Sequence, residues 1–334
     1  VSVPGYERDK EQKEFAALIK RLQKTVSFHT EQAMSIAWGN GSIITTPRYD
    51  DGLQFTSAKQ ETMRLKHGLS CVRRSNETGH HYFISNLQGK DVDAYVELGT
   101  AFKAAALYDP MTGSIGQAKV DGQGRVRLQL KSGESIIVRT YDGDAAASLS
   151  KLRTYRYYDA LEYRATTLKK WTLRFKDAAP VAISKTYTMD NGAKPWTSLG
   201  DSLLNTTMAT GVYSTSFEMP MIPTNAAFIL DLGDVRETAH VTVNGKDAGT
   251  LFAVPYRMDI TGLLHQGHNT LDVEVANLPA NRIAQMDRDG VEWRRFKEIN
   301  VVDLNYKKGH YDGWKVVPSG LNSDVRLVPC TIVE

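Results

Sequence analysis

The chain has very little cysteine, with Cys71 and Cys330 the only two in 334 residues. Neither has a second cysteine at the C-x-x-C spacing of metal and redox sites, so the sequence predicts no cysteine-based centre. Free cysteines are commonly buried, and we interpret these two as buried free thiols. The alternative is a disulfide that links the first and last regions of the chain.

Long apolar runs and an excess of one charge are also absent. No stretch of about 18 apolar residues occurs, so no transmembrane helix is predicted. The 41 Lys and Arg residues against 38 Asp and Glu give a net charge of +3, with the two signs interspersed. Proteins that bind nucleic acid usually carry a clustered basic face, so no nucleic-acid partner is predicted.

The signatures of several enzyme classes are missing as well. The sequence contains no G-x-S-x-G, H-E-x-x-H, P-loop or G-x-G-x-x-G motif. His80 and His81 are the only adjacent histidines. Successive residues of a strand point to opposite faces, so this pair is a poor metal site and we interpret it as structural.

What the sequence does contain is a regular alternation of apolar and polar residues. Residues 239–243 alternate in this way, and residues 270–276 place Leu271, Val273 and Val275 on one face. Between these runs, Asn244-Gly245 supplies the positive-φ residues of a tight hairpin turn. Sheets with one buried face and one wet face predict a β-sandwich.

The length allows two or three domains. We predict a mainly β chain with two β-sandwich, jelly-roll-like domains, one at residues 71–165 and one at residues 166–334. A short, partial α/β segment at residues 1–70 precedes them. Two turn-bounded strand patterns, 82–85 and 125–130, support the first sandwich, and the alternating run 211–219 supports the second.

The α/β segment is predicted from one helical and two strand patterns. Residues 7–24 read as an amphipathic helix, and its apolar face is formed by Phe15, Leu18, Ile19 and Leu22. Short strands are expected at residues 34–38 and 42–46, with a turn between them. The apolar face of the helix would need a partner, which the sandwiches could supply.

The patterns of the last domain carry a family resemblance. The stretches LDLGDV, VTVNGKDAGTL, PYRMDITGLL and GHNTLDVEVANL, within residues 228–278, resemble the galactose-binding-like β-sandwich of glycoside hydrolase family 2. Residues 281–327 resemble the C-terminal end of the large bacterial α-L-rhamnosidases of glycoside hydrolase family 106. Upstream, residues 72–86 and 107–113 resemble further stretches of the same family, although Val72 replaces the usual His and Tyr108 the usual Trp.

This resemblance implies an accessory role in a bacterial enzyme system that degrades polysaccharides. In the family, the catalytic glutamates and a calcium site belong to an upstream barrel. No segment of this chain matches a barrel, which takes about 200 residues or more. The resemblance therefore implies a non-catalytic region that binds or positions a plant-type glycan for an upstream catalytic domain, in a periplasmic or secreted protein.

Two other functions are left open. The chain could be a glycoside hydrolase in its own right, and its catalytic candidates are then the acidic residues Asp287, Asp289 and Glu292. Arginines are interleaved with them, which favours a solvated loop with ion pairs. The other alternative is a purely structural module that has no ligand.

Sugar binding needs aromatic rings for the apolar face of a sugar and polar groups for its hydroxyls. The last domain offers such residues at Trp196, Phe252, Tyr256, Arg257, Asp259, Trp293, Tyr311, Asp312 and Trp314. Each has a structural alternative: Tyr256 could pack, Arg257 could pair with Asp259, and the tryptophans could be buried. Arg73-Arg74 could clamp a uronate, or could be exposed or paired.

No cofactor is predicted with a specific signature, but β-sandwiches of this type often hold a structural calcium. Its ligands would be carboxylate, amide and carbonyl oxygens. The candidates are Asp231, Asp234, Asn244 and Asp247, whose spacing is not specific. Asp247 lies beside Asn244-Gly245 and is explained equally well by turn chemistry.

Overall fold

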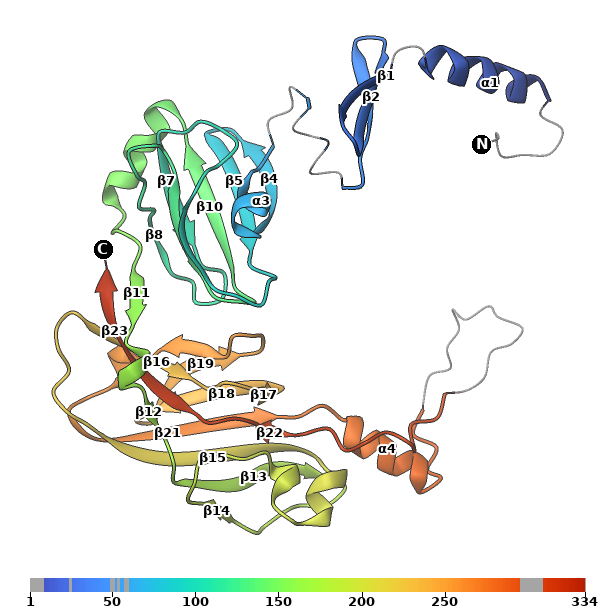
Figure 1. Ribbon diagram of the computed structural model, residues 1–334. Coiled ribbons are helices and arrows are strands. Elements are labelled where there is room, and N and C mark those ends of the chain that lie inside the picture. Colours follow the sequence, from blue (N-terminus) through green and yellow to red (C-terminus); the bar gives the residue numbers. More distant parts are fainter. Residues whose placement is uncertain are drawn as a thin grey trace.

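A computed structural model describes residues 9–23, 26–48, 52, 55–56, 60–294 and 309–333 of the chain. It is mainly β, as predicted. Figure 1 shows two layered β bodies, with a helix and a small sheet at the N-terminal side. None of the described helices is long and apolar enough to span a membrane.

The N-terminal segment is a helix followed by an antiparallel meander. The elements are α1 (Asp9–Gln23), β1 (Val26–Thr30), β2 (Ala33–Trp38) and β3 (Gly41–Thr45), and the sheet order is β1-β2-β3. The predicted strands at 34–38 and 42–46 are therefore confirmed to within a residue. Helix α1 buries none of its residues completely, and the predicted apolar face of Phe15, Leu18, Ile19 and Leu22 is half-buried. Residues 7, 8 and 24 of the predicted helix lie outside the described residues.

The first sandwich packs a five-stranded sheet against a strand pair. The sheet runs β4 (Ser70–Asn76), β5 (Gly79–Ser85), β10 (Ser135–Tyr141), β7 (Ala104–Tyr108) and β8 (Ile115–Gln117); the pair is β6 (Val92–Val96) and β9 (Val126–Leu130). Ile84 and Val138 from the sheet meet Val96 and Leu128 from the pair in one buried core. Helix α3 (Met63–His67) closes this core with Met63, and η1 (Gly143–Lys151) follows β10.

The second sandwich has a six-stranded and a five-stranded sheet. The first runs β14 (Tyr187–Met189), β13 (Trp171–Ala179), β15 (Met208–Met219), β21 (Gly267–Ala276), β18 (Thr238–Val243) and β19 (Lys246–Leu251). The second runs β11 (Tyr157–Ala160), β23 (Arg326–Val333), β16 (Ala226–Asp231) and β20 (Arg257–Asp259), with β12 (Thr166–Thr167) beside β23. Short elements complete it: β17 (Val235–Arg236), β22 (Gly320–Leu321), η2 (Glu162–Arg164), η3 (Trp196–Ser198), η4 (Ser202–Thr206), η5 (Thr261–Leu263) and α4 (Ala280–Arg288).

The alternation read from the sequence places side chains in this second sandwich correctly. Leu271, Val273 and Val275 are each fully buried, as one face of β21. Asn244 and Gly245 both have positive φ, at 52° and 73°, and join β18 to β19 as predicted. The inner faces of the two sheets thus form one core that also contains Trp171, Trp196 and Tyr213.

The two sandwiches share a strand region close to the predicted boundary at residue 165. Strand β11, which lies inside the predicted first domain, pairs with β23 at the C-terminus. Its Tyr157 is fully buried in the core of the first sandwich, and Val333 of β23 packs against that same core. The strand pair β11–β23 therefore belongs to both bodies.

Gly320 lies directly against two buried rings of the second core. Its φ is +103°, and an added Cβ would lie 2.1 Å from the Tyr213 hydroxyl oxygen and 2.8 Å from a ring carbon of Trp196. We predict that Gly320→Ala lowers the free energy of unfolding by about 3 kcal/mol, from the clash and the strained backbone. Gly313→Ala, with open space around its Cβ, is the matched control in urea denaturation. Equal midpoints for the two variants would contradict the packing described.

The two cysteines are free, which excludes the predicted alternative of a disulfide. Cys330 is buried and Cys71 is half-buried. Burial raises the pKa of the Cys330 thiol to about 11 and also raises the pKa of Cys71. Only the thiolate reacts with aromatic disulfide reagents, so a raised pKa slows the reaction at pH 8.

We therefore predict that Ellman's reagent labels the folded protein slowly at pH 8. Cys71 should react first, and Cys330 should react only when the protein unfolds. Mass spectrometry of labelled peptides, with and without urea, measures this order. Rapid labelling of Cys330 in the folded protein would contradict its burial.

Candidate functional site

Helix α4 follows strand β21 and is anchored by one buried side chain. The Asn281 amide donates to the Val317 carbonyl oxygen at 2.8 Å, and the Val317 N–H donates back to the Asn281 side-chain oxygen at 2.8 Å. An asparagine amide can pair with the backbone in this way because it carries both a donor and an acceptor. The contact holds α4 beside the segment that leads into β22.

At the C-terminal end of α4, Asp287 joins two segments that are distant in the sequence. Its Oδ1 accepts the Trp293 indole N–H at 2.5 Å, and its Oδ2 accepts the Tyr311 backbone N–H at 2.6 Å. These two donors, the indole first, hold the pKa of Asp287 below its ordinary value. Asp287 is therefore ionised at neutral pH and fixes the positions of both aromatic residues.

Trp293, Tyr311 and Trp314 form what we call the aromatic cluster. The ring centroids of Trp293 and Tyr311 are 6.0 Å apart, and those of Tyr311 and Trp314 are 4.5 Å apart. The guanidinium carbon of Arg294 lies 4.8 Å from the Trp293 centroid and 5.2 Å from that of Tyr311. Trp314 is 49% exposed, whereas the other two rings are half-buried. The Trp314 ring thus faces solvent and packs against the Tyr311 ring behind it.

Polar groups border the exposed ring. Asp312 and Gly313 form the turn between two of the rings, in which the Trp314 N–H donates to the Tyr311 carbonyl at 3.0 Å. Arg288 holds this turn to α4 by donating to the Asp312 carbonyl at 3.0 Å. The structure therefore brings together four of the predicted sugar-binding residues, Trp293, Tyr311, Asp312 and Trp314.

The three catalytic candidates lie at the same end of α4, but their chemistry differs. A glycosidase general acid needs a carboxyl group with a raised pKa. The pKa of Asp287 is lowered instead, and both of its oxygens accept hydrogen bonds within the cluster. Asp289 accepts from the Gln285 amide at 2.7 Å, and Glu292 is exposed. Asp287 is thus placed to position the aromatic cluster.

The other predicted sugar-binding residues lie away from the aromatic cluster, and several of them are buried in the second sandwich. Tyr256 is only 6% exposed, and its hydroxyl donates to the Glu237 carbonyl at 2.6 Å. Its ring packs in the second core, so the packing alternative describes it better than a sugar platform. Trp196, also offered as a sugar residue, is fully buried in that core, whereas Phe252 is 61% exposed.

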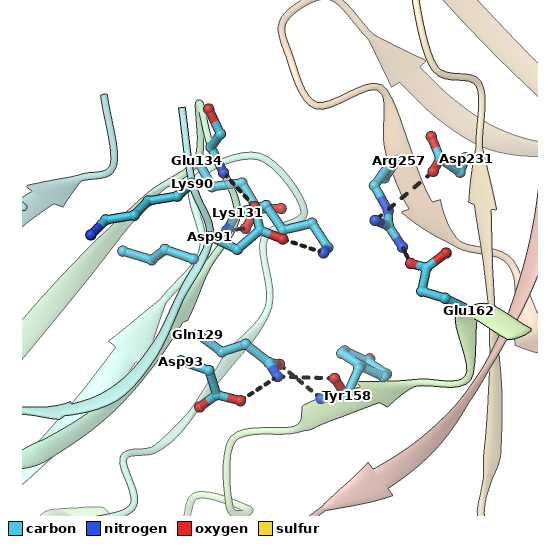
Figure 2. Close-up of polar contacts among 12 residues, drawn as sticks. Lys90, Asp91, Asp93, Gln129, Lys131, Glu134, Tyr158, Glu162, Asp231 and Arg257 are labelled. Carbon is cyan, nitrogen blue, oxygen red and sulfur yellow. Dashed lines mark hydrogen bonds and ion pairs between the residues drawn. The ribbon is translucent and has the colours of Figure 1, made fainter. Parts of the chain in front are cut away.

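Arg257 pairs with different partners from the one predicted. Figure 2 shows its guanidinium between Asp231 and Glu162, with N···O distances of 3.9 Å to each. Asp259, the partner expected from the sequence, instead accepts the Tyr158 hydroxyl at 3.0 Å and the Thr261 N–H at 2.9 Å. Arg257 and Asp259 are therefore occupied in holding the junction of the two sandwiches.

Tyr158 is the residue of this junction that sequence reasoning missed. Its N–H donates to the Gln129 side-chain oxygen at 2.8 Å, and its carbonyl accepts the Gln129 amide at 2.9 Å (Figure 2). Gln129 belongs to the first sandwich and Asp259 to the second, so Tyr158 links the two. No local pattern could have shown this, because its partners lie 29 and 101 positions away.

The predicted calcium ligands do not converge, and each one contacts different protein groups. Asp231 accepts Arg326 at 2.7 Å, and Asp234 pairs with Arg236 at 2.7 Å. The Asn244 side chain binds the Thr270 N–H and the Leu263 carbonyl, both at 2.9 Å. Among the residues the structure describes, no three His, Cys, Asp or Glu side chains are grouped to hold a metal ion.

Asp247, the fourth calcium candidate, accepts the Gly249 N–H at 2.7 Å, which is the turn chemistry described above.

Arg73 and Arg74 of the first sandwich have the structural roles expected as alternatives to binding a uronate. The Arg73 guanidinium is 2.6 Å from a Glu61 carboxylate oxygen, and the other oxygen of Glu61 accepts the Gly99 N–H at 2.8 Å. Arg73 is therefore paired, while Arg74 is exposed. Adjacent His80 and His81 face Ser75 and Arg74 of β4, respectively.

Comparison with known proteins finds a family model that matches most of the second sandwich. Residues 189–322 match the family model described as glycosyl hydrolase 2 galactose-binding domain-like. A protein of Formosa agariphila named "Putative beta-glucuronidase" is 32% identical over 104 residues, which is 30% of this chain and 9% of that protein. The match range contains Asp231, Asp234, Asn244 and the whole aromatic cluster.

The fold of nearly the whole chain recurs in a larger enzyme. The structure of a rhamnosidase from Novosphingobium sp. PP1Y superposes with a TM-score of 0.58 and 23% identity. The match covers 96% of this chain and 29% of that one, so the chain spans less than a third of the rhamnosidase. The chain thus contains a β-sandwich similar to the galactose-binding-like domain of glycosyl hydrolase 2 enzymes, within a fold shared with a rhamnosidase.

Proposed function

We propose that this chain is the non-catalytic C-terminal region of an α-L-rhamnosidase-like glycoside hydrolase of family 106, and that it binds or positions a plant-type glycan. The observation that carries the proposal is the aromatic cluster. It presents a half-exposed Trp314 ring, backed by Tyr311, on the domain that matches the galactose-binding-like model. A pyranose ring has an apolar C–H face that stacks on such a surface.

The surroundings of Trp314 fit a polyhydroxylated ligand. The exposed Asp312 can accept hydrogen bonds from sugar hydroxyls, and Lys315 next to the ring is also exposed. Asp287, Arg294 and Tyr311 hold the platform in one geometry before the ligand arrives. Binding then orders few side chains, which lowers its entropic cost.

An accessory role agrees better with the site than catalysis does. Asp287 carries a lowered pKa and two hydrogen bonds, which suit a positioning group rather than a general acid. We propose that an upstream catalytic domain supplies the reaction and that the whole protein acts on polysaccharide in a bacterial periplasm or outside the cell. The calcium site that the family resemblance implies would then lie in that upstream catalytic domain.

The proposal is tested by binding and turnover with the purified chain. A glycan array should show saturable binding to rhamnose-containing plant glycans, and p-nitrophenyl α-L-rhamnoside should not be hydrolysed, with or without calcium. Turnover that persists through repurification and is lost in Glu292→Gln would establish the catalytic alternative. A complete lack of glycan binding would support the alternative of a purely structural module without a ligand.

Removal of the exposed ring should weaken binding without unfolding the domain. We predict that Trp314→Ala lowers the affinity for an array-positive glycan at least tenfold, since stacking contributes about 1.5 kcal/mol. Tyr163→Ala, which removes another exposed ring (78%) far along the chain, is the matched control and should bind normally. Affinities come from isothermal titration calorimetry and stability from thermal unfolding.

Asp287 should matter through the rings that it positions. We predict that Asp287→Ala weakens glycan binding and makes Trp293 more accessible to acrylamide quenching, because the indole N–H loses its acceptor. Asp289→Ala is the control, since Asp289 lies at the same helix end but accepts only from Gln285 among the contacts recorded for it. Indistinguishable quenching in the two variants would show that Asp287 does not hold the cluster.

A further inference from the structure

The outer face of the six-stranded sheet contains a hollow that the proposed function does not use. It has a volume of about 340 Å³, and its lining residues all come from four adjacent strands, β13, β15, β18 and β21. They are Arg174, Phe175, Lys176, Val212, Thr242, Asp272 and Glu274. Binding sites for small ligands start at about this size.

The register of the sheet explains why a hollow forms here. Arg174, Val212 and Glu274 are direct cross-strand neighbours in one row, and Ser214, Asp272 and Thr242 form the next row. Neighbouring strands lie about 4.8 Å apart. The short Val212 side chain therefore sits as an apolar floor between two long charged ones. Lys176 lies where the register of β13 shifts, and its ion pair with Glu274 places its side chain on the same face as Arg174.

The polar groups of the hollow are only partly used by the protein. Lys176 pairs with one oxygen of Glu274 at 3.2 Å, and the Ser214 hydroxyl donates to Asp272 Oδ1 at 2.5 Å. The Arg174 guanidinium and the Thr242 hydroxyl have no recorded partner within the described part of the chain. Donors and acceptors thus alternate around the apolar floor, at Arg174, Thr242, Asp272 and Glu274.

We propose that this hollow is a second carbohydrate-binding site, for one or two units of a neutral sugar. Every sugar hydroxyl both donates and accepts, so a neutral sugar can pair with the Arg174 guanidinium, the Thr242 hydroxyl and the second oxygens of Asp272 and Glu274 together. Val212 covers part of the sugar's C–H face, whereas the Phe175 ring packs inward against Tyr187 and Trp196. The two carboxylates Asp272 and Glu274 balance the two cations, and an acidic sugar therefore gains no net attraction.

The site is distinct from the aromatic cluster in residues and in elements. The hollow is built by strand residues of the sheet face, whereas Trp293, Tyr311 and Trp314 follow α4. Binding in the hollow therefore does not depend on the proposed function of the aromatic cluster. Loss of the Trp314 ring should leave binding in the hollow unchanged.

Titration of the ¹⁵N-labelled full chain followed by NMR tests this site. The probes are neutral disaccharides, namely rhamnosyl-glucose, cellobiose and galactobiose, with digalacturonate as the acidic counterpart. We expect saturable amide shifts at Val212, Thr242 and Asp272 with at least one neutral disaccharide. Shifts with digalacturonate alone, or no shifts at these residues with any probe, would overturn the proposal.

Three variants assign the shifts to the hollow. Val212→Trp fills the floor and should abolish binding, and Arg174→Ala removes a free donor and should weaken it about tenfold, with little effect on folding. Thr250→Ala is the control, because Thr250 lies at the end of the Arg174 row, opposite His240 on edge strand β19. Undiminished shifts in both Arg174→Ala and a folded Val212→Trp would show that the ligand binds elsewhere.

Discussion

Strand β23 pairs with three strands, and the arrangement of both sandwiches depends on this pairing. It is antiparallel to β11, β12 and β16, and so connects the middle of the chain with its C-terminal end. Through β11 it also fixes Tyr157, whose ring is buried in the first core and whose hydroxyl donates to the Arg127 carbonyl at 3.1 Å. Without β23, strand β16 would keep only β20 as a neighbour and expose an edge.

The parts of this fold that could be predicted from sequence are those encoded by short-range patterns. Alternation identifies β18 and β21 because each buries one face, and Asn244-Gly245 identifies the turn because few residues accept positive φ. Strand β11 could not be found in this way. Its residues pair with a strand about 170 positions later and are Tyr-rich without a clear period, so its role appears only when both sandwiches are assembled.

The candidate site shows the same limit at the level of side chains. The sequence puts an aromatic ring near a charged residue in two places, Tyr256 near Arg257 and Trp314 near Asp312. Tyr256 is nevertheless buried, whereas Trp314 is exposed. The difference depends on tertiary partners: the Glu237 carbonyl takes the Tyr256 hydroxyl, whereas Asp287 holds Tyr311 and leaves the neighbouring Trp314 ring open. Composition predicts which residues suit a sugar, and packing decides which can reach one.

The two sites proposed for the second sandwich differ in how they gain affinity. The aromatic cluster offers one large ring, so its affinity comes mainly from stacking and from the order that Asp287 imposes. The hollow offers separate polar groups on a rigid sheet, each of which must exchange a bond to water for a bond to the sugar, and its intrinsic affinity should be low. A glycan long enough to reach both would bind the second site at a high effective concentration. Two weak sites on one sandwich would therefore favour long chains over free disaccharides, which suits the accessory role that we propose.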